Sequence, residues 1–424
     1  MGYYGVIVPA YTGHLNPMSA LGRALQRRGH RVTFISQWDG EAAIRKAGLE
    51  FIPIGVEEFP RGEWERMTAQ AGELTGVKAG RFFGRWVARC TRGTHRDLPE
   101  IIDQERFDGL IMDQICIGAE SVCEIAALPL AIACNALTMH FESRVPPALF
   151  PWGFNTSLAA RARNLFGQIL VNSTGFPVFC EVVPFRFKHR LSQMAFTHVN
   201  TMPPSLVQVS QQPAFFDFPR TRLPPHFHYT GPWNEEDKSE AADFPWDRLS
   251  GRPLIYASMG TLQNRLRRVF PMIAEACAGL DAQLVIALGR KNALATEQLP
   301  GDPIVVGYAP QLALLKSASL VITHGGLNTT LECLKEGLPL IALPVTNEQP
   351  GIASRIKHLG LGEFIPIKNL TAMRLRNTIC HVLSSQSYRE QSLQRAKELR
   401  GLNGQSIAAQ LIESAFTTRE KVIA

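Results

Sequence analysis

The sequence predicts an α/β protein with two doubly wound parallel sheets, and three observations support that prediction. Short apolar runs rich in β-formers alternate with helical stretches, once in each half of the chain. This alternation is typical of parallel strands whose connecting helices cover both faces of a sheet. The chain has 424 residues, which is too long for one ordinary hydrophobic core. A stretch rich in proline and acidic residues separates the two series, as expected between two domains.

The first series belongs to an N-terminal domain that we place at residues 1–215. Helical stretches at 17–28 and 119–127 lie between its apolar runs. Residues 136–215 do not follow the alternation and are rich in aromatic residues and proline. We expect this apolar insertion to wall an apolar cavity, while ordinary packing between helices is the alternative. The buried strands of this domain are expected at residues 5–8, 32–35, 51–54, 109–112 and 130–134.

The second series belongs to a C-terminal domain at residues 251–386, with a helical stretch at 269–278. The linker between the domains is expected at residues 216–250, where Pro, Asp and Glu are frequent. The remaining residues, 387–424, are polar and helical in pattern. The buried strands of this domain are expected at residues 254–258, 284–288, 304–306, 320–323 and 340–343.

Composition and charge argue against several classes of protein. Hydrophobic residues make up 45% of the chain, and no uninterrupted apolar run is long enough to span a bilayer. The N-terminus lacks the features of a secretory signal, and the eight cysteines are scattered without a CxxC pair. The net charge of +7 is spread over dispersed basic residues. We therefore expect a cytoplasmic protein without a structural metal or a nucleic-acid-binding module, and peripheral contact with the inner face of the membrane stays open.

A histidine and an aspartate follow two predicted strands of the N-terminal domain. In PAYTGHLNPMSAL, Asn16 is expected to cap a helix and Pro17 to begin it, which leaves His14 in the loop after the first strand. Asp113 ends the strand predicted at 109–112, so we expect both side chains at the same sheet edge. An aspartate that holds one imidazole nitrogen supports general-base catalysis by the other. Taken singly, His14 would be structural or solvated, and Asp113 would be a helix cap.

A glycine-rich turn in the C-terminal domain, THGGLNTTLE, suits an anionic ligand. It joins a predicted strand to a helix, where backbone N–H groups bind phosphates. His324, Asn328 and Thr329 can donate further hydrogen bonds, and the carboxylate of Glu332 can accept from two ribose hydroxyls. The SMGT turn at 258–261 offers backbone N–H groups in the same way. Together these features fit a nucleoside diphosphate, although the stretch alone could be a plain strand-to-helix turn.

Two further loops are expected at the same edge of the C-terminal sheet. GYAPQLALL places Tyr308 and Gln311 after one strand, and LPVTNEQPG places Glu348 and Gln349 after another. An aromatic ring can stack on a base, and a Glu–Gln pair can bind sugar hydroxyls. Singly, these residues would be a buried tyrosine and an ordinary polar turn. The motifs GxGxxG, GxxxxGK[ST] and DxD are missing, so neither a dinucleotide oxidoreductase, nor a P-loop, nor a metal-dependent sugar site is indicated.

The three donor loops resemble the signature of the family-one, UDP-sugar-dependent glycosyltransferases. That signature usually reads W-x-P-Q, then H-x-G-x-N-[ST]-x-x-E, then P and [DE]-Q, and here it reads YAPQ, THGGLNTTLE, GLP and LPVTNEQ. The resemblance covers essentially the whole chain. Within the family, DFPRTRLPPHFHYTGP and ASMGTLQ are similar to the bacterial zeaxanthin glucosyltransferases. The resemblance implies the GT-B fold, with two facing Rossmann-like domains, the active site in the interdomain cleft and a C-terminal helix that crosses back.

The resemblance also implies roles for individual residues. Tyr308 would stack on uracil, where the family usually has tryptophan, and Gln311 would lie beside the uridine. Glu332 would bind the ribose, while Glu348 and Gln349 would bind the sugar; the remaining donor residues would hold the diphosphate. The expected donor-binding residues are Gly260, Thr261, Tyr308, Gln311, His324, Gly326, Asn328, Thr329, Glu332, Glu348 and Gln349.

By the same resemblance, His14 is the catalytic base and Asp113 orients it. We expect an inverting, metal-independent transfer of glucose from UDP-glucose, a co-substrate with no further cofactor, to a hydroxyl of a lipophilic small molecule. The acceptor would be a carotenoid such as zeaxanthin, a terpenoid, a polyketide or a flavonoid, bound against Phe141, Phe150 and Trp152. A UDP-sugar 2-epimerase, which needs no large acceptor chamber, and a non-catalytic UDP-sugar-binding protein, which needs no base, are the alternatives. TDP in place of UDP also stays open.

Overall fold

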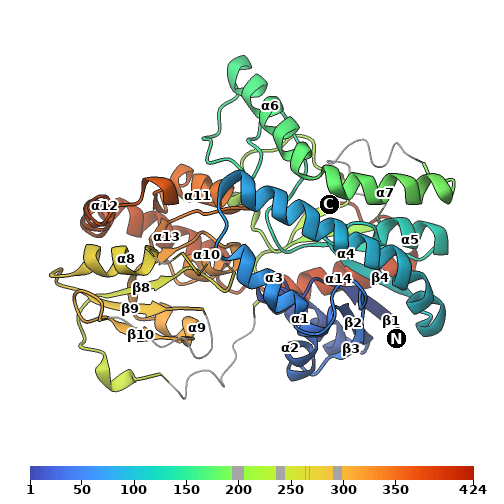
Figure 1. The fold of residues 1–424 in the computed structure, drawn as a ribbon, viewed down its shortest axis with the longest axis horizontal. Helices are drawn as coiled ribbons and strands as arrows, with labels where there is room; N and C mark the ends of the chain where they lie inside the picture. Colours follow the sequence, from blue (N-terminus) through green and yellow to red (C-terminus); the bar gives the residue numbers. More distant parts are fainter. Residues whose placement is uncertain (193–204, 235–243, 263, 267, 290–297) are drawn as a thin grey trace.

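The computed structural model describes residues 1–192, 205–234, 244–262, 264–266, 268–289 and 298–424. It contains two all-parallel sheets, one in each half of the chain, with helices packed against them (Figure 1). The N-terminal sheet has the strand order β3-β2-β1-β4-β5-β6-β7, and the C-terminal sheet has the order β10-β9-β8-β11-β12-β13. In both sheets the order reverses beside the first strand, so that β1 pairs with β4 and β8 pairs with β11. Ligands of such sheets bind at the carboxyl ends of the strands where the order reverses.

All ten strands predicted from the sequence are present, and β6, β7 and β13 are additional. The N-terminal sheet consists of β1 Tyr3–Ile7, β2 Arg31–Ser36, β3 Glu50–Pro53, β4 Gly109–Asp113, β5 Leu130–Cys134, β6 Val207–Ser210 and β7 Phe227–Tyr229. The C-terminal sheet consists of β8 Leu254–Ser258, β9 Gln283–Ala287, β10 Ile304–Val306, β11 Ala318–Thr323, β12 Leu340–Ala342 and β13 Gly362–Phe364.

The two extra strands of the N-terminal sheet lie in segments for which no strand was predicted, and β7 lies beyond the predicted N-terminal domain. β6 lies inside the predicted insertion, 136–215, and β7 lies inside the predicted linker, 216–250, of which residues 235–243 are outside the described residues. Both strands are short and carry polar side chains, so they lack the apolar pattern of a buried strand. The free-energy cost of burying the polar side chain of Gln208 is offset by a hydrogen bond, because its Oε1 lies 2.7 Å from Nε2 of His140. The N-terminal sheet therefore continues to the end of β7.

Fourteen α-helices connect and flank the strands within the described residues. The first, α1, begins at Thr12 with Tyr11 as its N-cap, so the predicted start at Asn16 and Pro17 is wrong. The N–H groups of His14 and Leu15 already bond to the carbonyl of Tyr11, which closes the first turn. The helices are α1 Thr12–Arg27, α2 Glu41–Lys46, α3 Glu63–Ala71, α4 Gly76–Glu105, α5 Ala119–Ala126, α6 Leu158–Thr174, α7 Phe176–Lys188, α8 Val269–Cys277, α9 Gln311–Leu315, α10 Leu327–Lys335, α11 Gln349–His358, α12 Ala372–Ser384, α13 Gln386–Leu399 and α14 Gly404–Thr418.

The last helix, α14, packs on the N-terminal domain although α13 before it packs on α10 of the C-terminal domain (Figure 1). Ala408, Ile412 and Phe416 are buried in the same cluster as residues of α1 and β1. A Cβ atom on Gly109 would lie 2.6 Å from the Phe416 ring, so the helix can approach only because that position is glycine. The chain thus crosses back between the two domains at its end.

A buried ion pair also joins the domains. Nη2 of Arg355, on α11, lies 2.6 Å from Oδ1 of Asp217, which follows β6. The other oxygen of Asp217 accepts hydrogen bonds from Arg220 and Tyr229. Burial raises the pKa of Asp217, but the two guanidinium groups and these hydrogen bonds lower it by more than burial raises it. The pKa of Asp217 is therefore well below the ordinary value of an aspartate. The carboxylate therefore stays charged inside the boundary between the domains.

The predicted insertion contains α6 and α7, and α6 projects from the body of the molecule (Figure 1). The two helices are joined at Gly175 and bent by 69° to each other. No single helix of the described residues is long and apolar enough to cross a membrane, whereas α6 and α7 meet that criterion as a bent pair.

Candidate functional site

His14 and Asp113 form a hydrogen-bonded pair at the edge of the N-terminal sheet. Nδ1 of His14 lies 2.8 Å from Oδ2 of Asp113. Asp113 ends β4 and is fully buried, whereas His14 lies in the first turn of α1 and keeps 19% of its side chain exposed. The two residues meet because β1 and β4 are neighbours at the point where the strand order reverses. The structure therefore brings together the pair that the sequence predicted.

Two further groups hold the Asp113 carboxylate. The side-chain amide of Asn135 donates to Oδ2 at 2.7 Å, and the main-chain N–H of Ile115 donates to Oδ1 at 3.0 Å. Each carboxylate oxygen thus accepts a hydrogen bond, and these bonds set the orientation of the carboxylate relative to the imidazole of His14. Sequence reasoning missed Asn135. Its position directly after the strand predicted at 130–134 was the available signal.

The pKa of His14 responds to opposing influences from both domains. Burial lowers it, while the charge of Asp113 and the hydrogen bond to Asp113 raise it, and the net result lies above the ordinary value of 6.5. The charge of Glu348, from the C-terminal domain, adds to the upward shift. The imidazole is therefore well suited to accept a proton, and it is close enough to Glu348 to respond to its charge.

An aromatic cluster lies next to His14 on its own domain. The ring of Tyr11 has its centroid 5.7 Å from that of His14, 4.7 Å from that of Trp64 and 4.9 Å from that of Trp86. Trp64 is on α3 and Trp86 is on α4, and Leu262 of the C-terminal domain packs against the same cluster. Sequence reasoning missed these residues because a mixed aromatic stretch in helices has no distinctive spacing. They give His14 an apolar neighbourhood.

In the C-terminal domain, His324 lies between two glycines of the predicted donor site. A Cβ atom would lie 2.6 Å from its ring if added to Gly260, which follows β8, or to Gly326, which caps α10. Burial lowers the pKa of His324 to about 4, with only partial opposition from a hydrogen bond to the backbone of Ser258. At neutral pH the ring is therefore uncharged, and its one N–H serves the hydrogen bond to the backbone of Ser258. Thr261, next to Gly260, is partly buried in the same turn.

Gln311, Thr329 and Glu332 form a hydrogen-bonded group beside this turn. Nε2 of Gln311 donates to Oε2 of Glu332 and, at 3.3 Å, to Oγ1 of Thr329. The hydroxyl of Tyr256, on β8, donates to Oε1 of Gln311 at 3.0 Å. Tyr256 was missed because it stands inside a buried strand. Tyr308, on the loop before α9, is about half exposed and presents its ring at the surface.

Asn328, expected to bind the diphosphate, contacts the N-terminal domain. Its Nδ2 donates to the carbonyl of Gly13 at 2.8 Å, and its Oδ1 accepts from Nε2 of Gln211 at 2.8 Å. Gln211 directly follows β6. The carboxyl edges of the two sheets therefore face each other, with the donor loop of one domain in contact with the first turn of α1 in the other.

The two residues expected to bind the sugar differ in their surroundings. Glu348 is partly exposed and precedes α11. Gln349 is buried, and its Oε1 accepts from the N–H groups of Val345 and Thr346 at 2.9 and 3.1 Å. Gln349 thus shapes its own loop. Its predicted contact with the sugar stays a prediction.

Of the residues expected to bind the acceptor, Phe150 and Trp152 support α6. Their rings stack with centroids 4.1 Å apart, and both lie so close to Gly167 of α6 that a Cβ atom there would touch them. The carbonyl of Trp152 also accepts from the hydroxyl of Ser354 on α11. Phe141 is partly buried. Phe150 and Trp152 thus pack against α6, as expected from the alternative of ordinary packing between helices. Contact with an acceptor stays a prediction for all three residues. Within the described part of the chain, no group of three or more potential metal ligands lies together.

Comparison with known proteins agrees with this architecture. The family described as UDP-glucoronosyl and UDP-glucosyl transferase matches residues 71–398, and the glycosyltransferase family 28 N-terminal domain matches residues 12–86. A zeaxanthin glucosyltransferase of Pantoea ananas is 31% identical over all of this chain and 98% of its own length. A zeaxanthin glucosyltransferase of Pseudescherichia vulneris is 28% identical over the full length of both.

Solved structures show the same fold. The calicheamicin glycosyltransferase CalG4 superimposes with a TM-score of 0.73 over 99% of both chains at 19% identity. The glycosyltransferase of kitacinnamycin gives a TM-score of 0.72 over 98% of this chain and 99% of its own, at 22% identity. The predicted GT-B fold is thereby confirmed. This chain belongs to the family of UDP-glucuronosyl and UDP-glucosyl transferases, and it is a glycosyltransferase.

Proposed function

We propose that this enzyme transfers glucose from UDP-glucose to a hydroxyl of a lipophilic small molecule, with inversion, to give a β-glucoside. The observation that carries the proposal is the His14–Asp113 pair, at 2.8 Å, on the side of the domain boundary opposite the donor loops. A histidine held in this way is suited to act as a general base. Its partly exposed ring leaves room for an acceptor hydroxyl to approach.

The proposed reaction is a single displacement. Nε2 of His14 takes the proton of the acceptor hydroxyl while the oxygen forms a bond to the anomeric carbon of the sugar. The bond between that carbon and the diphosphate breaks, and UDP leaves with the bonding electron pair. Asp113 stabilises the imidazolium that forms. General-base assistance of this kind contributes roughly 10²–10⁴ in rate.

The C-terminal loops would hold the donor. One nitrogen of the His324 ring is hydrogen-bonded to the backbone of Ser258, so its other nitrogen donates to the diphosphate only when the ring is protonated, a form that the negative charge of the diphosphate favours. Glu332, already oriented by Gln311, is placed to accept from the ribose hydroxyls. The exposed ring of Tyr308 is available to stack on the base. Glu348, whose charge reaches His14, would bind the sugar between the two domains.

Two observations support a lipophilic acceptor. Two relatives that match the whole chain are zeaxanthin glucosyltransferases, and the cluster around Tyr11, Trp64 and Trp86 makes the neighbourhood of His14 aromatic. We propose a carotenoid diol of the zeaxanthin type as the first acceptor to test, followed by other hydrophobic alcohols.

The proposal is tested with purified protein, UDP-glucose or TDP-glucose, and a panel of zeaxanthin, terpenoid, polyketide and flavonoid alcohols. Mass spectrometry should detect a hexosylated product with UDP-glucose, and the proton NMR coupling at the anomeric position should identify a β-linkage. An α-linkage would refute inversion, and preference for TDP-glucose would refute the choice of donor. Conversion of UDP-glucose to its C2 epimer without any acceptor would instead identify an epimerase.

A further inference from the structure

The bent helix pair α6 and α7, called the hairpin below, carries many large apolar side chains on its outside. On α6 the exposed large residues are Leu158, Leu165, Phe166, Ile169 and Leu170, which share one face of the helix at spacings of three and four residues. Leu158 is 82% exposed and Phe166 is 60% exposed. In a helix that only covers a protein core, these residues would point inward.

The inward face of α6 is polar or small. Asn164 is fully buried, and its Nδ2 donates to the carbonyl of Ser143 at 2.9 Å. Gln168 is also buried and donates to Asn172 at 2.9 Å, while Gly167 lies against the Trp152 ring. The polarity of the helix is therefore reversed relative to the protein body.

The second helix also has apolar residues on its outer face, although its inner face is mainly apolar as well. Phe176, Phe179 and Phe187 of α7 are exposed, the last by 79%, while Val178 and Val182 are buried in the protein. Apolar residues concentrated on the outer faces of two adjacent helices are unusual for a surface that stays in water. This arrangement calls for an apolar environment outside the protein.

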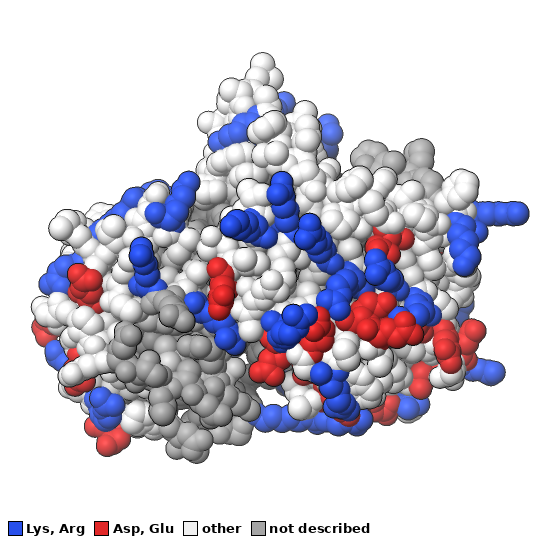
Figure 2. All heavy atoms as spheres, viewed as in Figure 1, with Lys and Arg blue, Asp and Glu red and all other residues white. Residues whose placement is uncertain are grey.

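The charge of the hairpin shows which environment fits. Residues 157–192 contain one acidic residue, Glu181, which pairs with Arg92, and a buried Arg186, which pairs with Glu124. The other basic residues are Arg161, Arg163, Lys188 and Arg190. Figure 2 shows the projecting region as mainly uncharged, with basic side chains at its flanks and no acidic side chain on the visible face. Two copies of the chain meeting through this surface would bring like charges together.

The neighbouring helix α4 extends the basic surface. Its N-terminal third abuts the bend between α6 and α7, since a Cβ atom on Gly84 would clash with the carbonyl of Thr174. Lys78 and Arg81 before that point and Arg85 directly after it are exposed, and none of the three has an ion-pair partner among the described residues.

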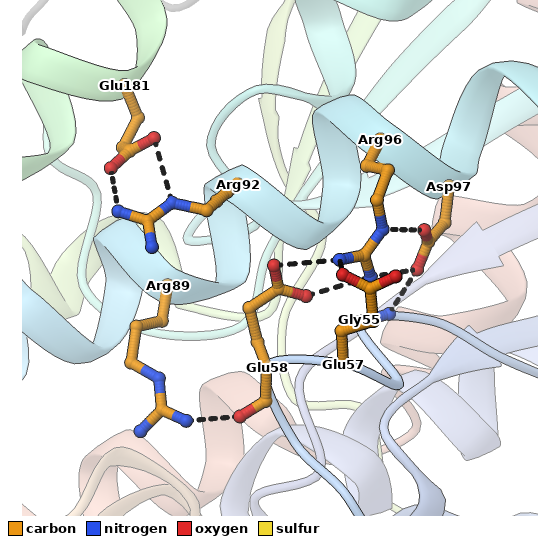
Figure 3. Close-up of polar contacts among 8 residues, drawn as sticks. All are labelled: Gly55, Glu57, Glu58, Arg89, Arg92, Arg96, Asp97 and Glu181. Atoms are coloured by element: carbon orange, nitrogen blue, oxygen red, sulfur yellow. Dashed lines mark hydrogen bonds and ion pairs between the residues drawn. The ribbon is translucent and has the colours of Figure 1, made fainter.

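Farther along α4 the basic residues are neutralised. Arg92 pairs with Glu181, and Arg96 pairs with Glu57, Glu58 and Asp97 (Figure 3). The uncompensated positive charge is therefore confined to the end of α4 that lies at the base of the hairpin.

We propose that the outer faces of α6 and α7 insert into the surface of a bilayer that contains anionic lipids, with Lys78, Arg81 and Arg85 at the headgroups. Apolar burial drives such insertion, and the basic residues add attraction to anionic headgroups. This proposal goes beyond glycosyl transfer and does not depend on the identity of donor or acceptor.

The test is flotation of the full chain with vesicles of phosphatidylcholine alone, or of phosphatidylcholine and phosphatidylglycerol in equal parts, without donor or acceptor. We expect stronger binding to the anionic vesicles, weakened by salt. The double substitution Phe166→Ser/Ile169→Ser should lower partitioning at least about tenfold on both vesicles. Arg81→Gln/Arg85→Gln should lower it at least about tenfold on anionic vesicles only.

Matched controls lie on the C-terminal domain. Met373→Ser removes an apolar side chain of α12 that is even more exposed than Phe166, and Lys368→Gln/Arg374→Gln removes two exposed charges. Neither should change partitioning, and circular dichroism should show that every variant is folded. The proposal would be overturned if the wild-type chain did not bind vesicles, or if Phe166→Ser/Ile169→Ser bound them as well as the wild type does. It would also be overturned if sedimentation showed a dimer that Phe166→Ser/Ile169→Ser abolishes.

Discussion

The side-chain amide of Asn328 donates a hydrogen bond to the main-chain carbonyl of Gly13, across the boundary between the two domains. In a regular helix that carbonyl would accept from the N–H of the fourth residue onward, which is Pro17. Proline has no N–H, so the carbonyl is left for a partner outside α1. Pro17 was expected to begin the helix. Because Pro17 instead lies inside the helix, the carbonyl of Gly13 is left to bond with the C-terminal domain.

Asn328→Ala should weaken the junction between the domains. Two hydrogen bonds are lost, to Gly13 and Gln211, and each contributes about 0.5–1.5 kcal/mol. We expect kcat/KM for the donor to fall roughly tenfold, measured by steady-state kinetics. Pro17→Ala supplies the missing N–H, so in that background Asn328→Ala should have a smaller effect. Purely additive effects would show that the two residues do not act on the same carbonyl.

His14→Ala should remove the general base. We expect kcat to fall by about 10²–10⁴, because the acceptor hydroxyl must then lose its proton to water. UDP binding, measured by calorimetry, should be unchanged, since the donor loops lie in the other domain. Wild-type turnover in this variant would refute the assigned role.

The pH dependence should report the His14–Asp113 pair. The base works when it is deprotonated, and its pKa is raised from 6.5, so kcat/KM should decline as the pH falls through a value above 6.5. Asp113→Asn removes the charge that raises the pKa and leaves the lowering effect of burial. The acidic limb of the residual activity should therefore move to lower pH. A limb that stays in place would mean that another group controls it.

Gly326→Ala should displace His324 without straining the backbone, because Gly326 has a φ of −68°. The new Cβ atom would lie 2.6 Å from the ring. Losing the ring's hydrogen bond to a charged diphosphate should weaken UDP binding by roughly tenfold or more in calorimetry. The same substitution should have little effect in a His324→Ala background. Gly153→Ala, where a Cβ atom meets nothing within 4 Å, is the matched control.

Arg355→Met should destabilise the protein by breaking a buried ion pair. Removal of one partner of such a pair costs about 3–5 kcal/mol, and Arg220 still compensates part of the Asp217 charge, so we expect about 3 kcal/mol. Chemical denaturation should measure the loss. Lys357→Met, on the same helix, breaks an exposed pair with Glu363 and should cost no more than about 1 kcal/mol. Similar losses in the two variants would contradict a special role for the buried pair.

Much of the proposed donor site could be assembled from the sequence because its residues are close together along the chain. His324, Asn328 and Glu332 lie in one strand–turn–helix unit, where glycine content and helical spacing already indicate which groups share a turn. The aromatic cluster at Trp64 and Trp86 and the ligand of Asp113, Asn135, could not be found in this way. Their positions depend on packing between elements that are distant in sequence.

The sequence by itself determined that the chain has two parallel-sheet domains, since apolar periodicity and turn chemistry act over a few residues. It also determined the residue types at the strand ends. Only the tertiary structure decided that β1 neighbours β4 and that the first turn of α1 includes His14. Strand order and helix start depend on the free energy of the whole packed sheet, in which distant strands compete for neighbours. That global packing is what places His14 2.8 Å from Asp113 and opposite Asn328 of the other domain.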